Sequence, residues 1–218
     1  MRILLVGGGG REHAIARALH RYGHDLAFTH ANPGFVALGS QAPRDPVQAA
    51  LACGAELVVV GPEQPLAEGL VDRLGAVGVP AFGPSAAAAR LESSKLFTKD
   101  LARRHGLATA DSKVLRRGDV VAIDRPWVVK LDGLAAGKGV WVCDTAHDTR
   151  LAVEAAFRSR PEAALLLEER LDGPELSVLG LSDGTRVVPL LPARDHKRRF
   201  DGDQGPNTGG MGAVAPAT

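Results

Sequence analysis

An apolar segment that runs directly into four glycines opens the chain, and it limits most strongly what the chain can fold into. Residues 2–6 are predicted to form a strand, residues 7–10 are all glycine, and apolar side chains then recur at helical spacing through residues 15–22. A glycine-rich turn between a buried strand and a helix is typical of parallel α/β sheets, whose ligands bind at the carboxyl ends of the strands. We therefore expect ligand contact at this turn; the alternative is a tight turn that serves packing alone.

Strands and helices continue to alternate through the first hundred residues. Residues 56–60 (ELVVV) are almost entirely apolar, as expected of a parallel strand that is buried on both faces. The other predicted strands are 26–29 and 80–82, and the predicted helices are 46–53 and 66–77. The fold class is accordingly α/β, with an N-terminal parallel-sheet, Rossmann-like domain over residues 1–100.

The pattern becomes α+β after a boundary near residues 84–110. Helices are predicted over 86–91, 94–105 and 148–159, and strands over 127–131, 140–143, 164–169, 175–181 and 186–191. The strands 127–131 and 140–143 flank a glycine-rich segment, so they are predicted to pair as a hairpin. Residues 192–218 show no apolar period and are predicted to form one long polar loop, which is typical of a functional or a flexible surface segment.

Charge and cysteine content exclude several classes of protein. The formal net charge is +1, from 26 basic and 25 acidic residues, so the chain is not a strongly basic nucleic-acid binder. Its apolar runs are far shorter than the roughly 20 residues that span a bilayer. Cys53 and Cys143 are too few for a disulfide framework. We therefore expect a cytoplasmic protein with no nucleic-acid or membrane partner.

The opening glycines depart from the dinucleotide-binding fingerprint. That fingerprint places glycine or alanine where this chain has Glu12, and an acidic residue after the second strand, where it has His30 and Ala31. An NAD(P)-dependent oxidoreductase is therefore the disfavoured alternative.

Residues 132–139 (DGLAAGKG) suit a phosphate-binding segment. Backbone N–H groups of the glycines would contact phosphate oxygens, and the Lys138 ammonium would neutralise charge. The spacing does not match a Walker A motif. Lys130 lies in an otherwise apolar strand, where a lysine needs a partner, and a strand lysine beside a glycine-rich hairpin also holds nucleotide phosphates in kinases. The alternative is a lysine at a sheet edge beside an ordinary hairpin.

Two polar segments follow. Residues 168–175 form a charged turn which, paired with the glycine segment, suits an adenosine-binding hinge. Residues 195–200 and 205–212 combine a basic cluster with an Asn-Thr-Gly-Gly nest that suits an anion. His196 would be a general base or simply a solvated side chain. No nucleophile elbow and no metal-ligand spacing is present in the sequence.

In this order, the motifs closely resemble the phosphoribosylamine–glycine ligase family of the ATP-grasp superfamily, along the whole chain. They are 7–13 (GGGGREH), 61–63 (GPE), 94–97 (SKLF), 130–139 (KLDGLAAGKG), 168–175, 195–198 (DHKR) and 206–212 (PNTGGMG). The resemblance implies an N-terminal substrate domain, a first ATP-grasp lobe over 101–190 and the start of a second lobe over 191–218.

The resemblance also implies roles for individual residues. The implied ATP contacts are Lys95, Lys130, Gly133, Gly137, Lys138, Gly139, Glu168, Glu169, Leu171 and Glu175. The implied substrate contacts are Gly9, Gly10, Arg11, Glu12, Asn207, Thr208, Gly209, Gly210 and Met211. The implied catalytic residues are Lys138, Asp195, His196 and Lys197.

The implied reaction joins glycine to 5-phosphoribosylamine through glycyl phosphate, with ATP and Mg²⁺, in purine biosynthesis. The family's magnesium ligands would lie beyond Thr218. We therefore expect the chain, as an incomplete ATP-grasp domain, to have little ligase activity alone and to expose apolar sheet surface. The alternatives are a non-catalytic ATP-binding fragment, half of a split enzyme whose second polypeptide supplies the rest, and another ATP-grasp carboxylate–amine ligase.

Overall fold

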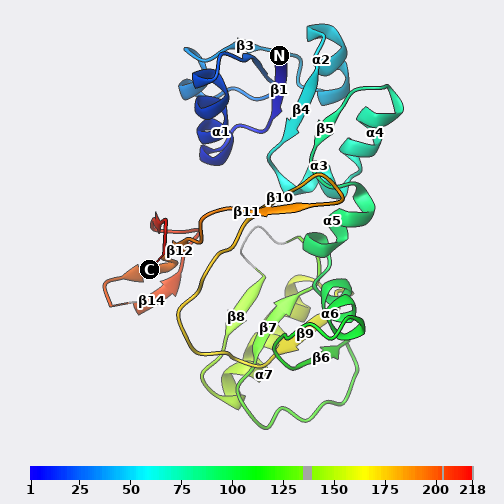
Figure 1. Cartoon of the computed structure of the whole chain (residues 1–218). Coiled ribbons are helices and arrows are strands. Elements are labelled where there is room, and N and C mark those ends of the chain that lie inside the picture. Colours follow the sequence, from blue (N-terminus) through cyan, green and yellow to red (C-terminus); the bar gives the residue numbers. More distant parts are fainter. Residues whose placement is uncertain (135–138, 203, 218) are drawn as a thin grey trace. The chain divides into compact units, whose positions relative to one another are not determined.

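The computed structural model describes residues 1–134, 139–202 and 204–217. They form two units, each described here by itself (Figure 1). The first unit consists of Met1–Thr109 with Asp132–Leu134, and the second of Ala110–Leu131 with the described residues after 138.

A five-stranded parallel sheet forms the centre of the first unit, in the order β3-β2-β1-β4-β5. The strands are β1 (Arg2–Val6), β2 (Asp25–Phe28), β3 (Ser40–Gln41), β4 (Leu57–Val60) and β5 (Ala81–Phe82). The central strand β1 pairs Leu5 with Phe28 on one side and with Val59 on the other. The predicted parallel sheet is confirmed, while the two-residue strand β3 carried no recognisable sequence signal.

Six α-helices accompany this sheet in the described part of the first unit. They are α1 (Gly10–Arg21), α2 (Pro46–Cys53), α3 (Glu63–Ala67), α4 (Leu70–Ala76), α5 (Ala86–Ser93) and α6 (Lys95–Arg104). The single helix predicted over 66–77 is wrong. Gly69 adopts φ of +77°, a conformation that an α-helix cannot continue through, and α3 and α4 are therefore separate.

Helices cover both faces of the sheet. On one face Leu4 and Val6 pack with residues of α2 and α4; on the other, Ile3 and Leu5 pack with Ala16 of α1. Figure 1 shows α1 on one side of the strands and α2 and α4 on the other. Four consecutive β1 side chains are buried as a result, which explains why that strand is apolar throughout.

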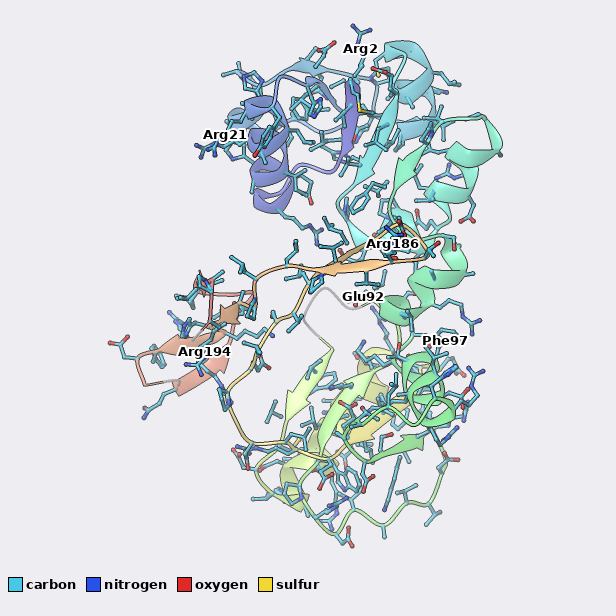
Figure 2. All side chains as sticks on the ribbon, in the orientation of Figure 1. Arg2, Arg21, Glu92, Phe97, Arg186 and Arg194 are labelled. Carbon is cyan, nitrogen blue, oxygen red and sulfur yellow. The ribbon has the colours of Figure 1, made fainter. Side chains whose placement is uncertain are left out.

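Polar contacts of Arg2 join the amino-terminal ends of two strands to the carboxyl-terminal end of a helix. The Arg2 guanidinium, labelled in Figure 2, donates from Nε to Asp25 Oδ2 at 2.8 Å and from Nη1 to the Cys53 carbonyl at 3.0 Å. It thus ties the starts of β1 and β2 to the end of α2. The polar residues at the carboxyl ends of the strands are described below.

The second unit contains a four-stranded antiparallel sheet in the order β6-β9-β7-β8. Its strands are β6 (Ser112–Leu115), β7 (Val128–Leu131), β8 (Val140–Val142) and β9 (Leu165–Glu168), and its helix is α7 (Ala146–Ser159). A capping box of Thr145 and Asp148 starts α7. Ala152, Val153 and Ala156 of this helix pack on the sheet. The predicted hairpin around the glycine-rich segment is confirmed as β7 and β8.

In the described residues after β9, three two-stranded pairs follow. They are β10 (Gly180–Ser182) with β11 (Val187–Pro189), β12 (Arg194–Asp195) with β15 (Ala213–Val214), and β13 (Arg198–Phe200) with β14 (Gln204–Asn207). The prediction of one polar loop over 192–218 is therefore wrong. These strands are two to four residues long and mostly exposed, so backbone pairing rather than an apolar period defines them. Leu181, Val187 and Val188 are exposed on the β10–β11 pair.

Candidate functional site

Lys130 of β7 and Glu168 of β9 form an ion pair on the antiparallel sheet. Val128 lies opposite Glu168, and Lys130 lies opposite Leu166, so the two charged residues are diagonal neighbours on one face. The Lys130 side chain is 29% exposed and that of Glu168 is 11% exposed. Lys130 was expected to need a partner because it lies in an apolar strand. That partner is Glu168, which is itself one of the predicted site residues.

The backbone after β9 places Glu169 beside the start of β6. The Glu169 N–H donates to the Asp111 carbonyl at 2.8 Å, and its carboxylate lies 3.8 Å from the Arg125 guanidinium. Leu171, two residues further on, has an exposed side chain. Both of these predicted ATP contacts therefore have side chains that reach solvent.

Lys197 brings together two predicted groups of residues. Its ammonium donates to Glu175 Oε2 at 2.8 Å and lies 3.8 Å from Asp195 Oδ2. The hydrogen bond to Glu175 raises the pKa of Lys197 above its ordinary value, while burial lowers it. Lys197 therefore stays protonated at neutral pH, with its ammonium paired to these two carboxylates.

Backbone hydrogen bonds align the segment around His196 with the segment around Met211. The Met211 N–H donates to the His196 carbonyl at 2.7 Å, and the His196 N–H donates to the Gly212 carbonyl at 3.0 Å. Thr208 donates to the Lys197 carbonyl from its N–H at 2.7 Å and from Oγ1 at 2.9 Å. The two motifs predicted to share a site are therefore adjacent in the structure.

Glycines allow the close approach of these two segments. The Gly210 N–H donates to Thr208 Oγ1 at 3.0 Å, in a turn where Gly210 has φ of +118°. A Cβ at Gly210 would lie 3.2 Å from Asp195 Oδ1. Gly209 lies between these residues, and the Asn207 backbone pairs with Arg198.

The glycine-rich segment is described only at its ends. The Lys95 ammonium donates to the Gly133 carbonyl at 2.8 Å. At the other end, the Leu131 N–H donates to the Gly139 carbonyl at 2.8 Å and closes the base of the β7–β8 hairpin. Gly137 and Lys138, both predicted ATP contacts, lie outside the described residues.

Glu12 fills the glycine-rich turn at the start of α1. Its side chain is 6% exposed; Oε2 accepts the Gly9 N–H at 2.6 Å and Oε1 accepts Arg11 Nε at 2.9 Å. A Cβ at Gly7 would lie 2.9 Å from Glu12 Cγ, and one at Gly61 would collide with the carboxylate. The glycines therefore make room for the protein's own carboxylate at a helix N-terminus, where a dinucleotide would place its pyrophosphate.

The same turn presents Arg11 outward, with Gly10 as the first residue of α1. The Arg11 side chain is 60% exposed, and its Nη2 lies 3.9 Å from Glu63 Oε2. Of the four predicted substrate contacts in this turn, Arg11 thus offers an accessible charged group, whereas the Glu12 carboxylate is enclosed.

Sequence reasoning did not select Asp132 as a site residue. Its carboxylate accepts the Leu96 N–H at 3.2 Å and the Ser94 hydroxyl at 3.2–3.3 Å, one residue before the Gly133 carbonyl that binds Lys95. The sequence signal that could have identified Asp132 is its position directly after an apolar strand and directly before the first glycine. At this position a carboxylate can point away from the sheet.

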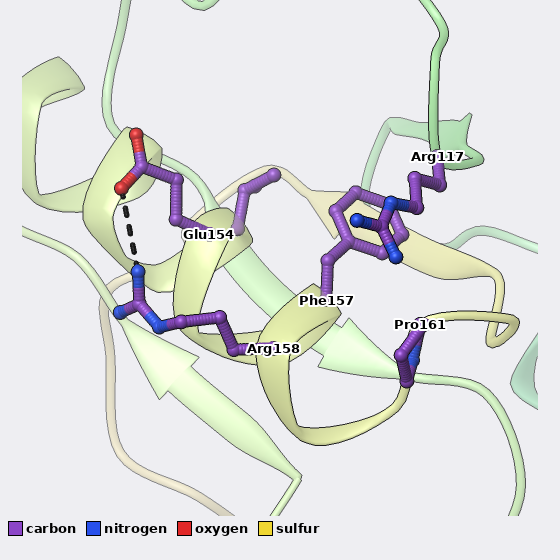
Figure 3. Close-up of a pocket in the computed structure, with 6 residues that line it drawn as sticks. Arg117, Glu154, Phe157, Arg158 and Pro161 are labelled. Atoms are coloured by element: carbon purple, nitrogen blue, oxygen red, sulfur yellow. Dashed lines mark ion pairs between the residues drawn. The ribbon is translucent and has the colours of Figure 1, made fainter.

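A shallow pocket of about 410 Å³ lies beside α7 in the second unit (Figure 3). Its lining includes Phe157, Pro161 and Arg117, together with Glu154 and Arg158, which form an ion pair at 3.6 Å. Among the described residues, none of the predicted site residues lines it.

Within the described ranges, no group of three or more histidine, cysteine or acidic side chains is placed to hold a metal ion. None of the helices in the described part of the chain is both long enough and apolar enough to cross a bilayer.

Two family models match the chain end to end. Residues 1–92 match the N domain of phosphoribosylglycinamide synthetase, and residues 93–218 match its ATP-grasp (A) domain. Among curated relatives, phosphoribosylamine–glycine ligases from Streptomyces coelicolor and Rhodopirellula baltica are both 46% identical over 99% of this chain, which corresponds to 54% of each relative. The chain thus spans about half the length of the curated relatives it matches.

Solved structures agree with the family models. Phosphoribosylamine–glycine ligase from Thermotoga maritima is 33% identical with a TM-score of 0.85, over all of this chain and 56% of that one. D-alanine–D-alanine ligase from Coxiella burnetii shares the fold, with 17% identity and a TM-score of 0.62 over 89% of this chain and 70% of that one. By the matching family models and relatives, the chain belongs to the phosphoribosylamine–glycine ligase family of ATP-grasp enzymes.

Proposed function

We propose that the chain binds ATP and serves the ATP-dependent ligation of glycine to 5-phosphoribosylamine, a reaction of purine biosynthesis. Family membership along the whole chain supports this reaction. The observation that carries the proposal is the convergence at Lys197: one ammonium contacts Glu175 from the predicted adenosine segment and Asp195 from the predicted substrate segment. Thr208 hydrogen-bonds to the same residue.

The reaction needs no nucleophile from the protein. A glycine carboxylate oxygen attacks the γ-phosphorus of ATP, the bond from that phosphorus to the β,γ-bridging oxygen breaks, and ADP leaves. The amine of 5-phosphoribosylamine then attacks the acyl carbon of glycyl phosphate, and phosphate leaves as the amine loses a proton. The protein positions the reactants and neutralises charge.

Cationic and backbone N–H groups would carry out that neutralisation. We assign the phosphates of ATP to Lys95, Lys130 and the glycine segment with Gly133, Gly137, Lys138 and Gly139. We assign the adenosine to Glu168, Glu169, Leu171 and Glu175. Lys130 and Glu168 are an ion pair in the protein, so ATP binding would exchange this carboxylate for a phosphate as the ammonium's partner.

The remaining predicted residues would contact the other substrates. We assign these contacts to Gly9, Gly10, Arg11, Glu12, Asp195, His196, Lys197, Asn207, Thr208, Gly209, Gly210 and Met211. Magnesium, when bound, would neutralise charge on the ATP phosphates. The described residues hold no group of three or more histidine, cysteine or acidic side chains placed for a metal, so we assign no ligand and no step to magnesium in this chain. A cytoplasmic location fits the use of cysteine, since Cys53 and Cys143 are both free.

Binding and turnover test different parts of the proposal. Isothermal titration of the 218-residue chain with ATP is expected to show binding, and Lys130→Met is expected to weaken it. Absence of ATP binding would contradict the proposal. We expect the chain alone to form little glycinamide ribonucleotide in a turnover assay, because it spans about half of its relatives. Turnover at the rate of a full-length relative would contradict that expectation.

A non-catalytic ATP-binding module remains the second candidate. The other candidate is half of a split enzyme. The exposed apolar side chains of β10 and β11 favour it, because a two-stranded pair with Leu181, Val187 and Val188 exposed needs a covering surface. The turnover assay repeated with a separately expressed C-terminal half of a relative separates the two. Restored turnover supports the split enzyme, and continued inactivity supports the binding module.

A further inference from the structure

A carboxylate from a residue far along the chain holds the start of α6. Asp132 Oδ1 accepts the Leu96 N–H at 3.2 Å, and the Ser94 hydroxyl donates to Oδ2 at 3.2 Å. The same Ser94 oxygen accepts the Phe97 N–H at 3.1 Å. Ser94 and Asp132 therefore satisfy two of the backbone donors that the first turn of a helix leaves without a partner within the helix. The carboxylate also lies at the positive end of the helix dipole.

Lys95 lies within this capped turn. It is the first residue of α6, between Ser94 and Leu96, and its ammonium donates to the Gly133 carbonyl at 2.8 Å. Asp132 and Gly133 are consecutive. The Asp132 side chain binds the backbone of α6, and the Gly133 carbonyl binds the Lys95 side chain. Gly133 has φ of +96°, which glycine adopts without strain.

The helix is fixed on its other side as well. The Phe97 ring, labelled in Figure 2, lies 4.0 Å from the Arg90 guanidinium of α5. Thr98 Oγ1 donates to the Leu91 carbonyl. With α5 and Asp132 both attached, the backbone of Lys95 has little freedom to rotate, and the direction of its side chain depends on these contacts.

We propose that Asp132 is a positioning residue, whose carboxylate fixes the N-terminus of α6 so that the Lys95 ammonium stays at the start of the glycine-rich segment and meets the phosphates of ATP. The inference rests on the proposed function, because it assigns Asp132 a part in ATP binding. Gly133 holds the ammonium until a phosphate oxygen, which carries more negative charge than a carbonyl, replaces it. Asp132 itself contacts no ligand in this account.

Nucleotides with different numbers of phosphates separate positioning from simple stability. Asp132→Ala is expected to weaken binding of ATP and ADP roughly tenfold, the loss typical of one hydrogen bond to a charged group. Its effect on adenosine should be under twofold, because adenosine lacks the groups that Lys95 contacts. Asp132→Asn keeps an acceptor for the Leu96 N–H and should restore part of the affinity. Equal losses for ATP and adenosine would overturn the proposal.

Two further variants sharpen the experiment. Asp45→Ala removes a comparable helix cap, since Asp45 Oδ1 accepts the Gln48 N–H of α2 at 2.8 Å, and it should leave ATP affinity unchanged. Lys95→Met should weaken ATP binding, and adding Asp132→Ala should weaken it little more, because Asp132 acts through Lys95. Fully additive losses would overturn the proposal.

One measurement needs no nucleotide. Hydrogen exchange at the Leu96 amide is expected to be faster in Asp132→Ala than in the wild type, and unchanged exchange would overturn the proposed contact. If wild-type chain fails to bind ATP, the proposed function falls and this inference falls with it. If wild-type chain binds ATP and Asp132→Ala binds it equally well, only this inference falls.

Discussion

The parallel sheet of the first unit and the antiparallel sheet of the second carry their polar residues in different places. In β1, four consecutive side chains after Arg2 are buried, and at the carboxyl end of the strand polar residues begin only after the glycine turn. In β7, Val129 and Leu131 are buried while Val128 and Lys130 are partly exposed, so a charged residue lies within the strand. In the first unit the candidate binding residues other than Gly133 lie in the glycine turn and at the starts of α1 and α6, whereas in the second unit Lys130 and Glu168 lie on strands of the sheet.

The covering helices account for the difference. Both faces of the parallel sheet pack against helices, so a charged side chain within β1 would be buried without water. The face of the antiparallel sheet that contains Val129, Leu131, Leu165 and Leu167 packs against α7. The opposite face contains the Lys130–Glu168 pair, in which each charge compensates the other. Within this sheet, a charged pair that is largely withdrawn from water is thus tolerated because each of two neighbouring strands supplies the counter-ion of the other.

Truncations along the two central strands should show the largest effects. Leu4→Ala and Leu5→Ala lie on opposite faces of β1, and each is expected to cost about 2–5 kcal/mol, because both side chains are buried. In β7, Val129→Ala should cost about 1–3 kcal/mol and Val128→Ala less than about 1 kcal/mol. Urea unfolding monitored by circular dichroism measures these values. Equal losses of stability at Val128 and Val129 would contradict the comparison, because they would show that both faces of β7 are equally buried.

Removal of one charge from the strand pair should have the next largest effect. Lys130→Met leaves Glu168 without its ammonium partner and is expected to cost about 1–3 kcal/mol, less than for a fully buried pair. The 29% exposure of the Lys130 side chain is the reason for this reduction. The double variant Lys130→Met/Glu168→Leu should cost less than Lys130→Met alone. The control is Arg158→Met, whose exposed partner is Glu154, and which should change stability by under about 0.5 kcal/mol. A double variant less stable than the single one would contradict this account.

In the first unit, the buried carboxylate is that of Glu12 in the glycine-rich turn, so the substitution that tests it is made beside this turn and not on a strand. Gly61→Ala places a methyl group against the Glu12 carboxylate and is expected to cost about 1–3 kcal/mol through overpacking. Glu12→Ala in the same chain should recover part of this loss, because it removes the atoms in conflict. Thermal unfolding of the two single variants and the double variant measures the coupling. As a control, Gly75→Ala meets no atom within 4 Å and should not respond to Glu12→Ala.

The smallest effect is expected in the exposed segment after β9. The Glu175 hydrogen bond raises the pKa of Lys197, so the pair stabilises the folded chain fully below the ordinary lysine pKa. This contribution is lost as the pH rises through the raised folded-state value. Glu175→Gln should lower the Lys197 pKa and cost about 0.2–1 kcal/mol at neutral pH, because both side chains are largely exposed. An NMR titration of the Lys197 side chain tests this. Asp172→Asn is the control, and a Lys197 pKa unchanged by Glu175→Gln would contradict the pairing.

Local patterns predicted most of the fold. The apolar runs of β1 and β4 marked the parallel sheet, and the helix predicted from residue 94 is confirmed as α6, where the Ser94 hydroxyl accepts the Phe97 N–H. The failures have physical causes. The break at Gly69 depends on one positive φ angle, and β12 to β15 depend on backbone pairing between segments that lack an apolar pattern. The assignment of individual site residues stays a prediction.

The sequence by itself determined the main strands and helices of the two sheets, that Lys130 needs a partner, and that the ordered motifs belong to one family. These properties depend on the spacing of residues along the chain, and this spacing can be read from the apolar periodicity and from the positions of the glycines. Only the tertiary structure decided that Glu168 is the partner of Lys130, that Glu12 fills its own glycine turn, and that Asp132 caps α6. Each of these contacts except the one within the turn joins residues more than thirty positions apart, and such pairings depend on strand register and helix packing, which no local pattern encodes.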